Sequence, residues 1–232
     1  MNRGWRAALA IAATAVAPAL APSLQVVAPA LAGVGDRRHV ALTFDDGPHP
    51  SSTPAFLELL DRLGVRATFF LLGEQAAAYP ALARRIVVDG HEVALHGYRH
   101  RLLPTRSPSA TRDDLHRGYA SVATVTGVQP RWYRPPYGVL TPAAQAAAAE
   151  LGMRPVLWTD WGRDWTARAT PGTVYDTVTR RLAGGATVLL HDSDTQSAPG
   201  SWRATLGAVT PLAGACDRRG WTIGPLGEHR MA

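Results

Sequence analysis

Short apolar segments alternate with longer helix-like segments from residue 39 almost to the end of the chain. Seven of the short segments predict β-strands: His39–Phe44, Ala67–Leu72, Glu92–His96, Arg131–Pro135, Pro155–Thr159, Thr187–His191 and Trp221–Ile223. Strand–helix alternation repeated this often is typical of a largely parallel sheet with helical crossovers.

Polar and glycine residues mark the ends of the predicted helices. Three helices are expected to begin at a Thr-Pro pair, where threonine caps free amides and proline suits the first helical position: Thr53-Pro54, Thr141-Pro142 and Thr170-Pro171. Six glycines stand where helices should stop: Gly64, Gly90, Gly127, Gly152, Gly184 and Gly220.

The predicted fold class is α/β, a distorted, incomplete (β/α) barrel of about seven parallel strands. An open α/β sheet is the alternative. The chain has 232 residues, which suits one domain with a sizeable core, and it shows no linker and no repeat.

The first 32 residues predict a secretory signal peptide, which leaves residues 33–232 as the functional domain. Arg3 and Arg6 precede an uncharged apolar run, and residues 30–32 form a small-x-small cleavage pattern, with residues 19–21 as a second candidate. A retained membrane anchor is the alternative, but prolines interrupt the run: Pro18, Pro22 and Pro29. We therefore expect a secreted or cell-wall-associated protein without stable membrane insertion.

Composition narrows the class of protein. Apolar residues make up 46% and charged residues 18%, which is globular rather than disordered. The net charge is +6 and every basic residue is arginine, but the arginines are scattered and no recognition motif accompanies them, so we expect no nucleic-acid partner. Cys216 is the single cysteine and is expected to be a buried structural thiol.

Polar side chains that could act in catalysis or metal binding follow the predicted strands. They stand at or just after the carboxyl ends: Asp45, Asp46, His96, His100, Arg134, Asp160, Asp164 and His191. In parallel α/β folds these ends face the same way, so residues far apart in sequence should converge.

Asp46, His96 and His100 would supply one carboxylate and two imidazoles to a divalent metal and leave positions open for water and substrate. Two histidines four residues apart are also a common incidental pattern, and the aspartate pair at a strand end favours the metal interpretation. His91 lies nearby and is expected to be a surface loop residue.

Asp45 and His191 are the candidate base and acid. Adjacent side chains on an extended backbone point apart, so Asp45 should face water while Asp46 binds metal. Arg134 could hold Asp45 ionised or make a purely structural salt bridge. A carboxylate would keep His191 protonated, Asp164 in the first place and Asp192 in the second; the alternative is that His191 is a core histidine.

Five short motifs in order resemble the polysaccharide deacetylase family, also called carbohydrate esterase family four or the NodB-homology domain. They are TFDDGP at 43–48, HGYRH at 96–100, RPPYG at 134–138, Asp164-Trp165 and LLH at 189–191. The resemblance spans roughly residues 38–225. The family fold is a distorted (β/α) barrel, in agreement with the strand count.

The resemblance implies a role for each matching residue. Asp45 would be the catalytic base oriented by Arg134, and His191 the general acid supported by Asp164. The metal, zinc first and cobalt, nickel or manganese as alternatives, would be bound by Asp46, His96 and His100. The remaining matches would bind the substrate. The Tyr137 amide would help bind the oxyanion, Trp165 and Leu189 would line the pocket for the acetyl methyl group, and Pro136 would be a further substrate-binding residue.

Two departures from the family pattern stand out. Gly97 replaces the usual Ser or Thr of the second motif, which predicts a less rigid metal loop. Asp160 and Asp164 are separated by three residues instead of two, so the role of Asp160 is open. Three tryptophans there would form either a substrate wall or plain core: Trp158, Trp161 and Trp165.

The function expected from these observations is removal of N-acetyl groups from an amino-sugar polymer, with peptidoglycan or chitin-type substrates both suitable. Three alternatives remain open at this point. They are a catalytically inactive metal- or glycan-binding wall protein, an O-acetyl esterase of xylan type, and an amide hydrolase of a small cytoplasmic molecule. The oligomeric state is not predicted.

Overall fold

The computed structural model describes residues 25–231, and the strands within this range form one curved sheet in which every pairing is parallel. Its order is β5-β4-β3-β2-β1-β7-β6, with β8 paired to the start of β1. In chain order the strands are β1 (His39–Asp45), β2 (Thr68–Leu71), β3 (Glu92–Leu95), β4 (Trp132–Tyr133), β5 (Arg154–Pro155), β6 (Asp160–Trp161), β7 (Thr187–His191) and β8 (Thr222–Gly224). The predicted incomplete (β/α) barrel is confirmed.

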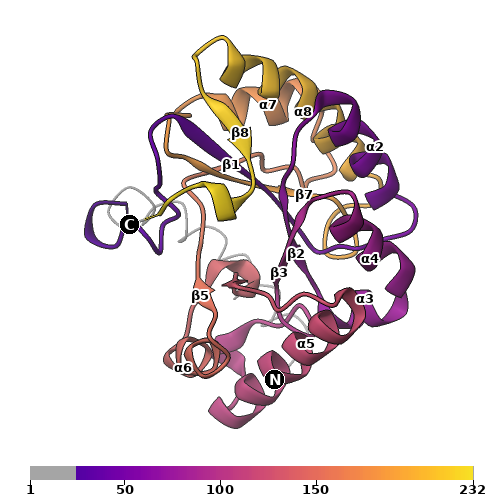
Figure 1. The fold of residues 1–232 in the computed structure, drawn as a ribbon, viewed down its shortest axis with the longest axis vertical. Coiled ribbons are helices and arrows are strands. Elements are labelled where there is room, and N and C mark those ends of the chain that lie inside the picture. Colours follow the sequence, from indigo (N-terminus) through magenta and orange to yellow (C-terminus); the bar gives the residue numbers. More distant parts are fainter. Residues whose placement is uncertain (1–24, 232) are drawn as a thin grey trace.

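The helices lie around the outside of this curved sheet (Figure 1). They bury the larger of two apolar cores against it, whereas a smaller apolar cluster fills the inside of the barrel. In chain order they are α2 (Thr53–Leu63), α3 (Gly73–Ala78), α4 (Pro80–Val88), α5 (Pro108–Thr126), α6 (Pro142–Glu150), α7 (Pro171–Thr179) and α8 (Trp202–Asp217).

The alternation of β1 decides which side chains reach the barrel interior. Leu42 and Phe44 belong to the core shared with the helices, whereas Ala41 belongs to the inner cluster. Successive side chains of a strand point to opposite faces, so Thr43 and Asp45 share the inner face with Ala41. The strand therefore delivers Asp45 to the interior at its carboxyl end.

The prediction of a single strand at Pro155–Thr159 is wrong. The chain forms β5 against β4 and, after a gap, β6 against β7 at the other end of the sheet order. Leu157 lies in that gap, where its carbonyl accepts from Arg134 at 2.8 Å and its amide donates to Leu31 at 2.7 Å. The stretch crosses between two sheet edges, and this crossing leaves the barrel incomplete.

Two of the three predicted helix caps are confirmed. Thr141 and Thr170 each accept a hydrogen bond from the backbone amide three residues further on. The prediction for Thr53 is wrong, because Ser52 takes the cap position and the Thr53 hydroxyl donates to Asp192 instead. Five of the six predicted stop glycines have positive φ, and at the remaining stop the positive φ falls on the next residue, Gly185.

Cys216 and His91 are both buried, which confirms one prediction and corrects another. Burial of Cys216 raises the pKa of its thiol to about 11, as expected of a structural cysteine. His91 is 6% exposed rather than at the surface. Its Nδ1 accepts from the Ala67 amide at 3.2 Å and its ring packs on Phe69, so the loop before β3 is folded inwards.

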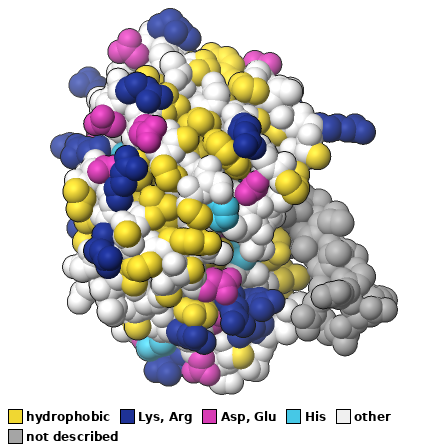
Figure 2. Space-filling model, turned by 90° about the vertical axis from the view of Figure 1, so that its right-hand side faces the viewer, with side chains coloured by type: hydrophobic (Ala, Val, Ile, Leu, Met, Phe, Trp, Pro, Cys, Tyr) yellow, Lys and Arg dark blue, Asp and Glu magenta, His cyan; other side chains and the backbone are white. Residues whose placement is uncertain are grey.

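The surface carries no field of a single sign on the face shown in Figure 2, where basic and acidic side chains are interspersed. None of the described helices is both long and apolar enough to span a bilayer. Most of the predicted signal segment lies outside the described residues.

Candidate active site

Asp45 and Asp46 face the same space, which corrects the expectation that they point apart. Strand alternation ends at Asp45, because Asp46 has φ of 77°, a left-handed conformation that aspartate tolerates better than most residues. Both carboxylates are buried and approach Nε2 of His96, with Asp45 Oδ2 at 3.8 Å and Asp46 Oδ1 at 3.5 Å.

Asp46, His96 and His100 bring one potential metal ligand atom each to within 4.8 Å of one another. Nε2 of His100 lies 3.7 Å from Oδ1 of Asp46, the same oxygen that His96 approaches. Among the described residues this is the one such group of three. One carboxylate and two imidazoles leave positions open, as catalytic metal sites do.

The protonation states of these three side chains suit the binding of a cation. Nδ1 of His96 donates to the carbonyl of Arg134 at 2.8 Å, which leaves Nε2 with a free lone pair facing Asp46. Burial, with the charge of Arg134, lowers the pKa of His96 to about 3, and burial lowers that of His100 well below its usual value. Oδ1 of Asp46 is buried without a hydrogen-bond partner, and burial raises the pKa of this carboxyl to about 7. An orphaned carboxylate oxygen between two bare imidazole nitrogens fits a divalent cation.

Arg134 fixes Asp45 from inside the barrel. Its guanidinium is fully buried and donates at 2.7 Å to Oδ1 of Asp45 and at 2.8 Å to the hydroxyl of Thr43. The guanidinium carbon also lies 4.0 Å from the ring centre of Phe70. Burial raises the pKa of Asp45, and the guanidinium opposes that effect. Arg134 therefore both orients the carboxylate and favours its ionised form.

His191 is held by Asp164, the partner expected first. Its Nδ1 lies 3.0 Å from Oδ1 of Asp164, and its backbone amide donates to Oδ2 at 2.8 Å. Nε2 of His191 lies 4.0 Å from Asp46 on the cavity side. Burial lowers the pKa of His191, but the carboxylates of Asp164, Asp46 and Asp45 outweigh it and raise the pKa to about 10.

These side chains open onto a cavity of about 600 Å³, part of it open to solvent. Trp165 and Leu189 line it as expected, and so does Tyr137. Pro136 does not line it, because the 3-10 turn at Pro136–Gly138 presents Pro135 instead. Other lining residues, not assigned a role by motif, are Trp158, Trp161, Gln196 and Ser197.

Aromatic rings form one wall of the cavity, so the substrate-wall interpretation of the three tryptophans is the one that the geometry favours. Trp161 stacks on Trp158 with ring centres 6.3 Å apart and meets Trp165 edge-on at 5.1 Å. Asp160 does not line the cavity, and its carboxylate accepts from the Thr159 hydroxyl at 2.8 Å.

The comparisons with known proteins agree with this geometry. The family model described as polysaccharide deacetylase matches residues 32–156. A chitooligosaccharide deacetylase of Bradyrhizobium sp. (strain ANU 289) is 37% identical over 203 residues, which cover 83% of this chain and 91% of that relative. The chain belongs to the polysaccharide deacetylase family. It is also 36% identical over 155 residues to a peptidoglycan-N-acetylglucosamine deacetylase of Listeria monocytogenes, spanning 67% of this chain and about a third (32%) of that protein.

Solved structures of other polysaccharide deacetylases share the fold. A family 4 carbohydrate esterase from Streptomyces lividans in complex with acetate has a TM-score of 0.74 at 30% identity, covering 85% of this chain and 98% of that one. A pseudoenzyme of this family from Bacillus anthracis has a TM-score of 0.76 at 27% identity, covering 84% and 66%. A mutant of that pseudoenzyme with restored activity superposes equally well. The pseudoenzyme and its active mutant thus share one fold, and the fold alone does not decide between them.

Gly97, the departure in the second polysaccharide deacetylase motif, lies in a loop that is hydrogen-bonded to two helices. Its φ is 101°, a conformation that side chains rarely adopt, and its carbonyl accepts from Gly73 of α3 at 2.9 Å. The next residue is held on both sides, because the Tyr98 amide donates to Asp114 of α5 at 2.9 Å and its carbonyl accepts from Glu74 at 3.0 Å. Backbone bonds to two helices brace the loop.

Two threonines that support the site were given no role from sequence. The Thr205 hydroxyl of α8 donates to Asp164 at 2.7 Å, and Thr43 supports Arg134 from β1. Asp192, the second candidate partner of His191, instead accepts a hydrogen bond from the Thr53 hydroxyl. Its carboxylate lies so close to Gly47 that a Cβ there would collide with it. No local signal marks Thr205, since it lies in an ordinary helical stretch.

Proposed function

We propose that this polysaccharide deacetylase is a metal-dependent hydrolase that removes N-acetyl groups from an amino-sugar polymer or oligomer outside the cell. One observation carries the proposal: Asp45, Asp46 and His191 face a single cavity, where a candidate base, a three-donor cation site and a candidate acid share the same space.

Asp46, His96 and His100 are proposed to hold the divalent ion, zinc in the first place, with cobalt, nickel and manganese also suited to this donor set. Such an ion, when bound, polarises a carbonyl oxygen and lowers the pKa of a water molecule. The neutral imidazoles and the orphaned oxygen of Asp46 support this assignment.

Asp45 is proposed as the general base. One of its oxygens is bound to Arg134, whereas Oδ2 accepts no hydrogen bond among the described residues. That second oxygen can take the proton of an attacking water as the water adds to the acetyl carbon. Burial makes the carboxylate a stronger proton acceptor, and Arg134 keeps it oriented.

His191 is proposed as the general acid. Asp164 accepts from Nδ1 and fixes the ring, so Nε2 is the nitrogen that faces the cavity. With its pKa raised to about 10 by the neighbouring carboxylates, the imidazole stays protonated at neutral pH. It can then give the proton from Nε2 to the departing sugar amine, which is a poor leaving group when unprotonated.

The cavity wall is proposed to hold the acetyl group and the sugar. Trp165 and Leu189 line the part beside His191, where a methyl group would fit. Tyr137 has φ of 60°, and its amide donates to no other backbone group among the described residues, so it is available to an oxyanion. Trp158 and Trp161 present ring faces that suit a second sugar.

The relatives guide the choice of substrate. Those cited act, by name, on chitooligosaccharide and on the N-acetylglucosamine of peptidoglycan. Both present the same N-acetyl group, and we propose that this group on an amino sugar is the reacting one. An O-acetyl esterase on xylan-type substrate is the alternative chemistry at the same residues.

We propose export with cleavage at the earlier candidate, after Ala21. The later candidate, between Ala32 and Gly33, is packed on the domain: Ala32 is 1% exposed, and the carbonyl of Gly33 accepts from the Thr187 hydroxyl at 2.6 Å. Cleavage there would remove the Leu31 carbonyl that Leu157 binds. N-terminal sequencing of the exported protein tests this choice.

A second candidate function is a catalytically inactive wall-binding protein, which the similarity to a Bacillus anthracis pseudoenzyme brings forward. The complete set of four residues, held as the pairs Arg134–Asp45 and His191–Asp164, favours activity instead.

The substrate is tested by mass spectrometry of the products from chitooligosaccharides, peptidoglycan fragments and acetylated xylan. Free amines on amino sugars are expected. Loss of acetyl only from xylan hydroxyls would replace the proposal with the esterase. Intact substrates throughout, with folded, metal-loaded protein, would leave the wall-binding function.

A further inference from the structure

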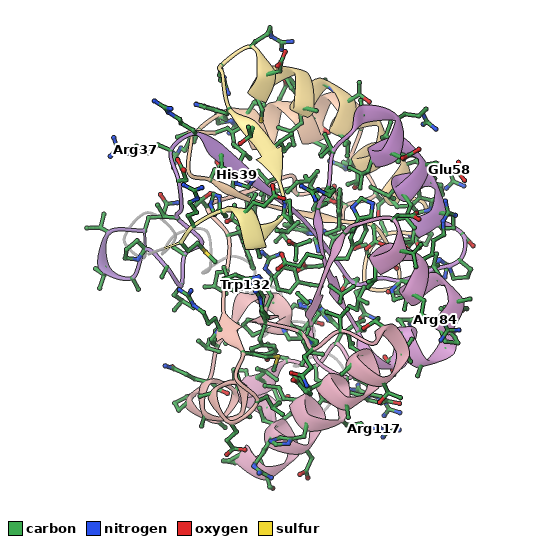
Figure 3. All side chains as sticks on the ribbon, viewed as in Figure 1. Arg37, His39, Glu58, Arg84, Arg117 and Trp132 are labelled. Atoms are coloured by element: carbon green, nitrogen blue, oxygen red, sulfur yellow. The ribbon has the colours of Figure 1, made fainter. Side chains whose placement is uncertain are left out.

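A second cavity lies beside the metal loop and is rich in arginine. It is bounded by the loop after β3 and the first turns of α5. Four arginines line it, together with two aspartates: Arg99, Arg101, Arg106, Arg117, Asp113 and Asp114. We call these four arginines and the space between them the arginine pocket. Figure 3 shows one of them, Arg117, on α5.

The arginine pocket has guanidinium groups without carboxylate partners. Arg99 pairs with Glu74 at 3.1 Å, but within residues 25–231 no ion pair joins Arg101, Arg106 or Arg117 to a carboxylate. Of the two aspartates, Asp114 is already engaged by the Tyr98 amide. The positive charge of the pocket therefore exceeds the negative charge that faces it.

Two of these arginines are held in place. Arg106 donates to the carbonyl of Ala110 at 3.0 Å, which leaves its buried Nε without a partner. Arg117 lies over the ring of Tyr98 with its guanidinium carbon 3.9 Å from the ring centre. Prearranged guanidinium donors with a buried unsatisfied N–H favour a carboxylate ligand, because they bind it by charge-assisted hydrogen bonds at little entropic cost.

The arginine pocket adjoins the reaction cavity. Arg99 and Arg101 flank His100, which lines the reaction cavity and packs against Tyr137 with ring centres 4.4 Å apart. A glycan that places an acetyl group beside His100 would extend towards the arginines.

We propose that the arginine pocket is a carboxylate-binding subsite, so that the preferred substrate is an acidic glycan whose neighbouring sugar carries a lactyl or peptide carboxylate. This inference rests on the proposed function and deepens it, because chitin-type oligomers have no such carboxylate and peptidoglycan fragments do. The arginines would contribute to substrate binding and leave the acid–base chemistry to Asp45 and His191.

The test compares three substrates with the full chain: a peptidoglycan fragment with free carboxylates, the same fragment with its carboxylates amidated, and a chitooligosaccharide. The variant is R101Q/R117Q, and the matched control is Arg84→Gln, an exposed arginine on α4 (Figure 3). For wild type and the control, amidation should raise KM about tenfold, the loss expected for one or two charge-assisted hydrogen bonds. For R101Q/R117Q, the KM values for the free and the amidated fragment should become equal. Added salt should weaken the preference of wild type for the free fragment and have no such effect on this variant.

Two results would overturn the carboxylate subsite: equal kinetics of wild type on free and amidated fragments, or an R101Q/R117Q loss as large on the chitooligosaccharide as on the acidic fragment. If no substrate releases acetate, the proposed function has failed separately. The subsite is then decided by calorimetric binding of the free and amidated fragments, where equal affinity would refute it. Melting curves exclude unfolding of the variants.

Discussion

The guanidinium of Arg134 and the carboxylate of Asp45 form an ion pair at 2.7 Å, with 0% of the arginine side chain and 3% of the aspartate side chain exposed. The same arginine offers its backbone carbonyl to His96. This residue, directly after β4, thus orients both the proposed base and one metal ligand, so its loss should affect stability and catalysis together.

Replacing Arg134 with Met should leave the Asp45 carboxylate buried and unpaired. We expect the free energy of unfolding to fall by about 3–5 kcal/mol, the usual cost of removing one partner of a buried pair. The double variant R134M/D45N should recover part of that loss, since it removes the orphaned charge. Urea unfolding of the three proteins measures this, and a double variant no more stable than R134M would contradict the ion-pair account.

Metal binding should depend on the two histidines that face Asp46. After exhaustive dialysis, wild-type protein should retain about one equivalent of divalent metal, and the H96A and H100A variants should retain almost none. His116 provides the control, because it is partly exposed and pairs with Glu150 instead. Elemental analysis measures the metal content, and full retention by H100A would remove His100 from the site.

Gly97→Ser should destabilise the protein, although Ser or Thr is the usual residue at this position of the family motif. The positive φ of 101° disfavours any side chain, and an added Cβ would lie 3.2 Å from Asp114 and 3.3 Å from the Arg99 carbonyl. We expect a loss of about 1–2 kcal/mol in unfolding free energy. Gly172→Ala is the control, because its nearest neighbour would be 3.9 Å away and its φ is not positive. A G97S variant more stable than wild type would show that the backbone hydrogen bonds do not hold the loop in this conformation.

Stability should fall in mild acid because of two buried histidines. Nδ1 of His39 lies 2.8 Å from Nδ1 of His229, whose Nε2 approaches the carbonyls of Gly33 and Gly185. Burial and the charge of His229 lower the pKa of His39 to about 4, with Asp36 opposing; burial also lowers that of His229. Figure 3 shows His39 on β1, near β8.

A histidine whose pKa is depressed by folding stabilises the protein fully above its unfolded pKa of about 6.5, and that stability is lost as pH falls towards the folded value. The free energy of unfolding should therefore decrease between pH 6.5 and about 4. His39→Gln should flatten this decline, and His116→Gln should leave it as steep as in wild type. An unchanged slope in H39Q would assign the pH dependence to other groups.

Much of the site was predictable because local pattern decides it. Strand ends can be recognised from apolar runs, and parallel strands bring their carboxyl ends together, so Asp45, Asp46, His96 and His191 converge as expected. The partnership of Arg134 with Asp45 also followed from complementary charge near two strand ends.

The remainder depends on contacts between distant segments. The split of Pro155–Thr159 into β5 and β6 reflects a change of pairing partner, which no local propensity encodes. The left-handed turn at Asp46 broke the strand alternation used to orient its side chain. Thr205 reaches Asp164 across 41 residues and has no motif of its own.

Acetate release by the purified full chain tests the central claim most directly. The assay compares wild type with Asp45→Asn, before chelation, after chelation and after zinc is restored, on chitooligosaccharide and peptidoglycan fragments. The account predicts metal-dependent acetate release from wild type and turnover at least about 100-fold lower for D45N, whose metal content should match wild type. Equal acetate release by D45N, or release that survives complete removal of metal, would contradict it.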